Sequence, residues 1–429
     1  MDSIARRLCR LSAACGFAAA LLATAGGAEA RGFNVLYHFC AQPPCTDGSW
    51  PYAPVIADSQ GNLFGTTGAG GVTNCKLYGC GTVFEVAADG TESVLHAFTS
   101  NTDGSGPRGG LIMDAKGNLY GTTTVGGGDG CGGAGYGCGT IFKVTPGGKE
   151  SILYNFAGGT TDGAYPVAGL VADAAGNFYG TASDGGGGTQ CNANFGGCGA
   201  IFKFATDGTE TMLYGFTGGK DGADIEAGLI LDKKGNLFGT AASGGHLSNC
   251  TLGLSPGCGT VFRLSPDGRE KTLYAFKGGN DGWSPIASLV EDKSGNLYGT
   301  TQAGGGTACS GLGCGIVFEI APDGTETILH VFTGGSDGQN PAAGMIIDAK
   351  GNLYGTTQGY YYPAGRGARQ TQTYGTIFKL APGGAFRVLY TFADPNNGAN
   401  PVANLAKGAN GVLYGTAEFP HGVVFQVDK

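Results

Sequence analysis

The stretch GNLYGTT, at Gly117–Thr123, returns unchanged at Gly295–Thr301 and at Gly351–Thr357. Close variants raise the number of copies to seven, and successive copies begin 56 to 60 residues apart. A repeat of nearly constant period indicates an array of like structural units rather than several unrelated domains. The seven copies begin at Gly61, Gly117, Gly176, Gly235, Gly295, Gly351 and Gly411.

Each repeat contains four short apolar segments, which in the second repeat lie at residues 110–113, 118–122, 139–144 and 151–156. They are rich in β-branched and aromatic residues and are bounded by Gly, Asp or Pro, which is typical of strands and too short for an amphipathic helix. Four strands per repeat without helices predict a β-propeller. A β-helix would need much shorter coils, and two stacked sandwiches would not keep one period over seven cycles.

The two ends of the chain indicate how the ring closes. The last repeat stops after its third strand, at Val423–Val427, while Phe33–Phe39 has the pattern of a fourth strand such as Ser151–Phe156. An open array would need polar caps instead of a split unit, and closure removes exposed sheet edges. The sequence therefore predicts an all-β, seven-bladed β-propeller with four strands per blade, closed by the N-terminal strand completing the C-terminal blade.

The core formed by GNLYGTT and the later Gly139-Thr140-Ile141-Phe142 resembles the Gloeobacter/Verrucomicrobium-type tandem repeat of the GloVer, or choice-of-anchor, proteins. The resemblance covers essentially all of residues 31–429. It implies a secreted or surface repeat protein, often with a C-terminal sorting anchor, and it supplies no catalytic residues. The sequence ends at Phe425–Lys429 without a sorting tail, so we do not expect surface anchoring.

The first thirty residues have the features of a secretory signal peptide. Arg6, Arg7 and Arg10 precede the apolar stretch Leu11–Ala25, and Ala28–Ala30 fits an A-x-A cleavage site. The apolar stretch is too short for a membrane span of about 20 residues. We therefore expect residues 1–30 to be removed and residues 31–429 to form one propeller domain, secreted or periplasmic and without a membrane span.

The composition excludes several classes of protein. Gly is abundant, with 86 of 429 residues, but 41% of the residues are hydrophobic, and a disordered chain would lack that apolar surface. Removing Arg6, Arg7, Arg10, Asp2 and Glu29 from 25 basic and 33 acidic residues leaves 22 and 31. No cluster of Lys or Arg remains, so we expect no nucleic-acid partner, and we expect a monomer.

Twelve of the fourteen cysteines follow the predicted signal peptide and form close pairs in sequence. An even number of cysteines in a secreted chain favours disulfides. Zinc would need four converging ligands, whereas these pairs are spread around a ring. We predict six local disulfides, each within one loop: Cys40–Cys45, Cys75–Cys80, Cys131–Cys138, Cys191–Cys198, Cys250–Cys258 and Cys309–Cys314.

An Asp-Gly pair recurs between the blades, and it could belong either to a calcium site or to a turn. Calcium requires six to eight oxygen ligands, but each loop offers one carboxylate. An Asx-type turn explains the pattern better, so we expect no metal and no cofactor. The six aspartates are Asp47, Asp103, Asp162, Asp221, Asp281 and Asp337, and Asn397 stands in the seventh repeat.

The connections between strands alternate in length along each repeat. Tight turns such as Pro266–Gly268 fall on one face of the propeller, and the long connections fall on the other, where binding residues are favoured. On this long-loop face, residues just after each Asp-Gly vary while their neighbours stay fixed, so they should rim the mouth of the central channel. These candidate ligand-binding residues are Trp50, Tyr52, Arg108, Tyr165, Asp224, Glu226, Trp283, Asn340 and Asn400.

Aromatic, amide and carboxylate groups at one mouth suit the binding of carbohydrate or peptide. We therefore predict a non-enzymatic binding or scaffold module with a glycan or protein partner at the long-loop face. An extracellular polysaccharide lyase or hydrolase is the alternative, for which Arg108, Glu226, Tyr52 and His421 are loose candidates for catalysis. A solvated rim without a ligand is a third possibility, because a fold by itself does not decide function.

Overall fold

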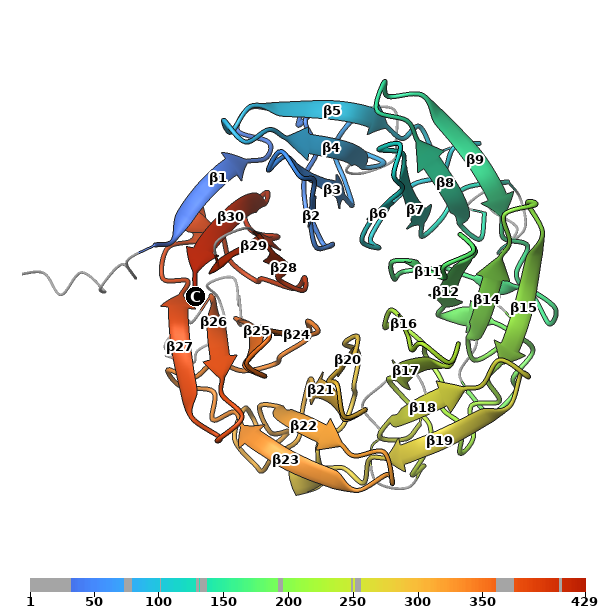
Figure 1. The fold of residues 1–429 in the computed structure, drawn as a ribbon, viewed down its shortest axis with the longest axis vertical. Helices are drawn as coiled ribbons and strands as arrows, with labels where there is room; N and C mark the ends of the chain where they lie inside the picture. Colours follow the sequence, from blue (N-terminus) through green and yellow to red (C-terminus); the bar gives the residue numbers. More distant parts are fainter. Residues whose placement is uncertain are drawn as a thin grey trace, which may run out of the picture.

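A computed structural model describes residues 32–72, 79–100, 102–128, 131, 137–191, 196–247, 250, 256–359, 374–408 and 411–429. The predicted signal peptide lies outside these residues. Seven four-stranded antiparallel sheets stand around a central axis, each with its shortest strand innermost (Figure 1). The prediction of an all-β, seven-bladed propeller is confirmed. In the described part of the chain, no helix is long and apolar enough to cross a membrane.

The first four blades run in sequence order from the innermost to the outermost strand. They contain β2 (Ile56–Ala57), β3 (Leu63–Thr67), β4 (Thr82–Val86) and β5 (Glu92–Ala97); β6 (Ile112–Met113), β7 (Leu119–Thr123), β8 (Thr140–Val144) and β9 (Glu150–Asn155); β11 (Val171–Ala172), β12 (Phe178–Ala182), β14 (Ala200–Phe204) and β15 (Glu210–Gly215); β16 (Ile230–Leu231), β17 (Leu237–Ala241), β18 (Thr260–Leu264) and β19 (Glu270–Ala275).

The last three blades follow the same plan, except that the outermost strand of the seventh comes from the N-terminus. They contain β20 (Val290–Glu291), β21 (Leu297–Thr301), β22 (Ile316–Ile320) and β23 (Glu326–Val331); β24 (Ile346–Ile347), β25 (Leu353–Gln358), β26 (Gly375–Leu380) and β27 (Phe386–Thr391); β28 (Ala406–Lys407), β29 (Val412–Ala417), β30 (Val423–Asp428) and β1 (Asn34–His38). The remaining elements are a small two-stranded sheet of β10 (Gly163–Ala164) and β13 (Asp184–Gly185) and the short 3₁₀ helices η1 (Gly279–Asp281) and η2 (Pro395–Asn397).

The first Thr of the repeated GTT or GTA sequence joins each blade to the next. Its buried hydroxyl donates a hydrogen bond to a backbone carbonyl on the channel-lining segment of the following blade, as Thr240 does to Ala287 O at 3.1 Å. Buried carbonyls must be paired, so this position favours a small hydroxyl side chain. The other six bonds are Thr66 to Gly109, Thr122 to Ala168, Thr181 to Ala227, Thr300 to Ala343, Thr356 to Pro401 and Thr416 to Ala53.

The Gly before this Thr makes room for a phenylalanine on the neighbouring strand. Gly239 lies opposite Phe262, and a Cβ at Gly239 would stand only 2.6 Å from the Phe262 ring. The Phe262 ring in turn packs edge-on against Phe216, which follows the outermost strand of the preceding blade. The same aromatic pair occurs at all seven junctions, with ring centroids 4.8–5.5 Å apart, so each repeat carries both a strand-three and a strand-four Phe.

The Asn and Tyr of GNLYGTT serve the tight turn before them. Asp114 Oδ1 accepts hydrogen bonds from the backbone N–H groups of Lys116 and Asn118, and Oδ2 accepts from the Asn118 amide and the Tyr120 hydroxyl. Partial burial alone would raise the pKa of Asp114, but these hydrogen bonds outweigh it and lower the pKa to about 2. The repeated motif therefore shapes a turn as well as a strand.

The N-terminal strand closes the ring as the sequence predicted. β1 pairs antiparallel with β30, and Phe39, just after β1, packs against Phe84 of the first blade. Thr416 of the seventh blade donates to Ala53 O of the first, across 363 residues of chain. The junction between the seventh and first blades thus uses the same hydrogen bond and the same aromatic pair as the other six, and Figure 1 shows β1 beside β30 in the closed ring.

Replacing Thr240 with Val tests the junction hydrogen bond, because Val fills the same space and leaves Ala287 O without its donor. We expect the variant to lose about 1–3 kcal/mol of unfolding free energy, the cost of an unpaired buried polar group. Urea unfolding followed by tyrosine fluorescence measures it. Thr211→Val, at an exposed site on β15, is the control. Equal midpoints for Thr240→Val and wild type would contradict the role assigned to this bond.

Deleting residues 32–39 tests ring closure. The deletion removes β1 and the Phe39 ring, so it should expose the edge of β30 and open the seventh junction. We expect a much lower melting temperature and aggregation, measured by calorimetry and size-exclusion chromatography. A monomeric deletion variant that melts like the full chain would show that the N-terminal strand does not close the ring.

Candidate functional site

The recurrent Asp-Gly pair ties each inter-blade loop to the strand that precedes it. Asp221 accepts hydrogen bonds from the backbone N–H of Thr217 at 2.8 Å and from the Tyr214 hydroxyl at 3.0 Å. The carboxylate thus reaches back along the loop, rather than closing an Asx turn with the residues that follow it. This fixes where each chain segment turns toward the central channel.

Three residues after that Asp, every blade holds one residue in the left-handed backbone conformation, with φ between 50° and 64°. Its N–H donates to a carbonyl on the long connection of the preceding blade, as Tyr165 does to Cys138 O and Asp224 to Cys198 O. These residues stand around the mouth of the channel and are called the rim residues below. They are Trp50, Gly106, Tyr165, Asp224, Ser284, Asn340 and Asn400.

Disulfides crosslink the long connections whose carbonyls accept the N–H groups of the rim residues. Five of the six predicted pairs are present, namely Cys40–Cys45, Cys131–Cys138, Cys191–Cys198, Cys250–Cys258 and Cys309–Cys314. Cys75 of the sixth predicted pair lies outside the described residues. Because the carbonyl of the second Cys accepts the rim N–H of the next blade, four of these crosslinks support the rim directly. Disulfides of this number fit an oxidising compartment such as the periplasm or the exterior.

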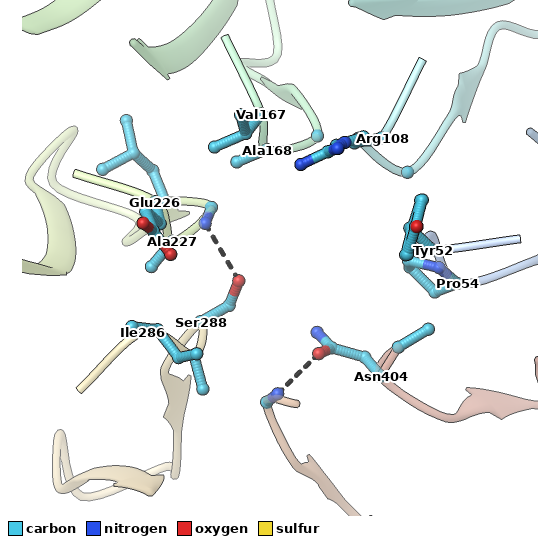
Figure 2. Close-up of a pocket in the computed structure, with 18 of the residues that line it drawn as sticks. Tyr52, Pro54, Arg108, Val167, Ala168, Glu226, Ala227, Ile286, Ser288 and Asn404 are labelled. Atoms are coloured by element: carbon cyan, nitrogen blue, oxygen red, sulfur yellow. Dashed lines mark hydrogen bonds between the residues drawn. The ribbon is translucent and has the colours of Figure 1, made fainter. Parts of the chain in front are cut away.

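A central cavity of about 330 Å³ lies inside the rim and is lined by residues of all seven blades. The first layer of its wall comes from the position two residues after each rim residue, and Figure 2 shows Tyr52, Arg108 and Glu226 in this layer. The side chains of the layer differ strongly between blades, whereas the strands behind them hardly differ. They are Tyr52, Arg108, Val167, Glu226, Ile286, Ala342 and Val402.

A second layer of the cavity wall consists of small residues and two polar side chains. Ser288 Oγ accepts a hydrogen bond from the Gly228 N–H at 3.1 Å, and Asn404 Oδ1 accepts one from the Gly344 N–H at 2.6 Å (Figure 2). A Cβ at Gly344 would stand 2.6 Å from Ser288 O. The channel is therefore narrow here because neighbouring backbones approach closely, and larger residues would clash.

Among the described residues, Arg108 is the only basic residue of the cavity wall, and it faces several acidic groups. Its guanidinium lies over the Tyr52 ring, 5.1 Å from the centroid. Burial in the wall raises the pKa of Glu226, the nearby Asp224 carboxylate raises it further, and Arg108 opposes both. Glu226 still has an accessible surface inside the cavity. Burial also raises the pKa of Glu418, against the Asn400 amide and Arg108, which lower it.

Asp184 adds a further carboxyl group on the same side as Asp224 and Glu226. Burial in the small β10–β13 sheet, together with the Asp224 carboxylate, raises the pKa of Asp184 to about 6. A carboxyl group with a raised pKa can accept hydrogen bonds from hydroxyl groups when it is ionised and can donate one when it is protonated. Perturbed carboxyls in a concave site are candidate functional groups.

The structure distributes the nine sequence-predicted residues over three places. Tyr52, Arg108 and Glu226 line the cavity. Trp50, Tyr165, Asp224, Asn340 and Asn400 are rim residues. Trp283 lies one residue before the rim position of its blade, where its indole N–H donates to Leu312 O at 3.2 Å and its ring packs on the blade core. His421, named for the enzymatic alternative, has an exposed side chain, and its carbonyl accepts the Trp50 N–H.

Sequence reasoning missed a second set of residues at the mouth. The residue directly after each GTT or GTA donates its backbone N–H to the carbonyl of the rim residue, as Gln302 does to Ser284 O and Glu418 to Asn400 O. Its identity varies between repeats, which is the same signal that revealed the rim residues, one strand further on. The polar members of this set are Thr124, Ser183, Gln302, Gln358 and Glu418, and Asp184 follows Ser183.

One family profile matches the chain. It is described as the Gloeobacter/Verrucomicrobia repeat and matches residues 24–192 and 250–429. No protein with curated function matches the chain.

Several solved structures match the chain. The chain is 11% identical to the extracellular domain of a protein described as a one-component system from B. thetaiotaomicron, with a TM-score of 0.53 over 92% of this chain and 40% of that one. It is 15% identical to a luciferin-regenerating enzyme, with a TM-score of 0.42 over 75% and 91% of the two chains. It is also 15% identical to a protein described as a gluconolactonase, with a TM-score of 0.41 over 92% and 91%. The similarity to the extracellular domain supports the fold alone. The TM-scores of the other two structures are too low to support any conclusion.

Peptide mapping of the unreduced protein tests the crosslinks that support the rim. We expect six links, each within one connection, including Cys75–Cys80. Each disulfide that closes a loop this short contributes roughly 2 kcal/mol to stability. Reduction should therefore loosen the loops at the mouth and increase proteolysis there before the strands unfold. Links between different blades, or free thiols in the oxidised protein, would be inconsistent with this arrangement.

Proposed function

Because the chain belongs to the Gloeobacter/Verrucomicrobia repeat family and its repeats differ from one another chiefly at one mouth of the channel, we propose that it is a secreted binding propeller that takes carbohydrate at that mouth. The ligand would enter on the long-loop face and contact the rim residues and the first layer of the cavity wall. The rest of the ring acts as a rigid scaffold that fixes the spacing of these groups.

The observation that carries this proposal is the presence of bulky side chains where the backbone favours glycine. The left-handed conformation of the rim position suits Gly106, but Trp50 and Tyr165 adopt it as well. For a large side chain this conformation is unfavourable, on the order of 1–3 kcal/mol. Both side chains are partly exposed, and Tyr165 also packs against the core of its blade. Retaining aromatic residues at a strained position is expected where their exposed parts have a role in addition to packing.

The chemistry around those aromatic faces suits sugar hydroxyls. Blades five to seven present amide and carboxyl groups at the mouth, with Gln302, Asn340, Gln358, Asn400 and Glu418, and the cavity wall below them is apolar, with Ile286, Ala342 and Val402. Amides and carboxylates exchange hydrogen bonds with hydroxyl groups, and the apolar patches match the C–H faces of a sugar ring. A protein partner at the same face is the alternative binding role.

A polysaccharide-active enzyme is the second candidate, favoured by the group of carboxyls around Glu226. General acid catalysis near neutral pH needs a carboxyl with a raised pKa, and Asp184, at about 6, and Glu226 have this property. Arg108 could stabilise developing negative charge on a substrate. Release of unsaturated or reducing ends from polyuronides and neutral glycans would favour this role over simple binding.

A glycan array with the oxidised protein, followed by calorimetry on the best ligand, tests the proposed binding. We expect Tyr52→Ala and Glu226→Gln each to weaken binding by about tenfold, because a well-placed contact at such a site contributes about 1–2 kcal/mol. Trp50→Ala should weaken it similarly. Melting temperatures should change little, since these side chains stand outside the blade cores.

Glu291→Gln is the matched control, because Glu291 lies on an innermost strand near the tight turns, at the other end of the channel. It should bind like wild type. If Glu226→Gln and Tyr52→Ala also bind like wild type, the mouth is not the site. If no glycan binds the wild-type protein, the carbohydrate proposal fails, whatever the variants do.

A further inference from the structure

A cluster of ionisable groups lies at the outer edge of five of the seven blade junctions. In each, a Tyr or His of one outermost strand contacts the Asp of the following Asp-Gly loop, and a Glu begins the outermost strand of the next blade. These junction clusters are Tyr37, Asp47 and Glu92; His96, Asp103 and Glu150; Tyr154, Asp162 and Glu210; Tyr214, Asp221 and Glu270; Tyr274, Asp281 and Glu326.

In these clusters the Asp accepts more hydrogen bonds than the Glu does. Asp162 accepts hydrogen bonds from the Tyr154 hydroxyl at 3.0 Å and from the Ala157 N–H. Among the described residues, Oε1 of Glu210 is buried without a hydrogen-bond partner, as is Oε1 of Glu92, Glu150 and Glu326. Glu270 differs in that Oε1 accepts from the Thr272 hydroxyl. No Lys or Arg forms a salt bridge with any of these glutamates in the described part of the chain.

The other two junctions replace the Glu with an aromatic ring. Phe386 stacks on His330 with ring centroids 3.8 Å apart, and Phe33 stacks on Tyr390 with centroids 3.7 Å apart. The place next to the Tyr or His can therefore be filled by an uncharged, apolar group. A glutamate fits the same place best when it too is uncharged, because burying a carboxylate beside another carboxylate is costly.

The electrostatic surroundings agree with this geometry. Burial raises the pKa of Glu92, Glu210 and Glu326 to about 7, and the neighbouring Asp47, Asp162 and Asp281 carboxylates raise it as well. At Glu92 and Glu210, a hydrogen bond with the Tyr37 or Tyr154 hydroxyl opposes the shift. Burial and Asp221 do the same for Glu270, against the Thr272 hydroxyl. Lys277 opposes the shift at Glu326, and His96 opposes it at Glu150, where Asp103 adds to it.

We propose that the five junction clusters are proton-dependent clasps, in which a protonated glutamic acid seals each junction and its ionisation loosens the ring. When protonated, the Glu of the four clusters that contain a Tyr can donate to the oxygen of the Tyr whose own proton goes to Asp, so one hydrogen-bonded chain crosses the junction. When ionised, it places a second carboxylate beside that Asp.

The direction of the effect follows from proton linkage. The folded chain holds these protons to higher pH than the unfolded chain, whose glutamates titrate near 4.3. The stabilisation is therefore complete below about pH 4 and is lost as the pH rises through about 7. The ring should be more stable at pH 5.5 than at pH 8.5. The turn aspartates, whose pKa is lowered, act in the opposite direction but only at lower pH.

Thermal unfolding of the oxidised protein between pH 5.5 and 8.5 tests the clasps. We expect the melting temperature to fall steadily over this range. In the variant with Glu92, Glu210, Glu270 and Glu326 all changed to Gln, which resembles the protonated acid, the melting temperature should fall much less and exceed that of wild type at pH 8.5. The slope that remains should come from Glu150 and from the carboxyls at the mouth, whose pKa is also raised. Glu270→Gln alone should remove part of the slope. Calorimetry in buffers of different ionisation enthalpy should detect protons released on unfolding at pH 6, fewer in the variants.

The control removes the same amount of charge from the same four blades. Asp89, Asp207, Asp267 and Asp323 lie in exposed hairpin turns, where Asn can replace Asp as the turn acceptor. Changing all four to Asn should leave the slope as in wild type. A wild-type melting temperature that does not fall with pH would overturn the proposal. So would a control that flattens the slope as much as the Glu variants, because the effect would then be general charge repulsion.

Discussion

The hydrogen bond from the first Thr of each GTT or GTA to the next blade is the contact on which the rest of the structure depends. This ring has the same donor and the same type of acceptor at all seven junctions, so an exception at one of them would leave a buried carbonyl unpaired. This explains why seven copies stay so similar while the loops between them diverge. The Gly before this Thr and the two Phe of each junction are repeated for a similar reason. One Phe ring packs directly on the Gly backbone, so no side chain fits at that Gly.

This regular scaffold carries an irregular mouth. The same backbone path brings each chain segment to the rim, where disulfide-linked connections accept its N–H groups. Side chains there are no longer constrained by neighbours in the core, so they can differ from blade to blade. The result is an asymmetric ring of groups in a symmetric frame, with charged and aromatic residues mainly on blades one to four and amides on blades five to seven.

The outer edge of the ring shows a second departure from strict repetition. Five junctions place a Glu beside a Tyr–Asp or His–Asp pair, and two place a Phe there instead. A Glu and a Phe can fill the same place in a junction, but only the Glu can bind or release a proton. The inner contacts thus repeat at every junction, and the variation lies at the outer edge, for which we propose an adjustment of stability, and at the mouth, for which we propose binding.

The sequence by itself determined the number of blades, the strands, the closure by Phe33–Phe39 and five of the six cysteine pairs, because each rests on local patterns in the chain; Cys75–Cys80 stays a prediction. It also predicted which positions would reach the mouth, since those vary while GTT does not. Only the tertiary structure showed that Tyr52, Arg108 and Glu226 line the cavity while the rim residues surround its mouth. It also showed that Trp283 packs within its blade and hydrogen-bonds to Leu312 O. Gln302, Gln358 and Glu418 were recognised at the mouth only from the structure. The reason is physical: a shift of one residue on an extended chain turns a side chain to the other face, and groups on different blades meet only once the ring has closed. The junction clusters needed the structure for the same reason, because their Tyr, Asp and Glu come from neighbouring repeats and share no local motif.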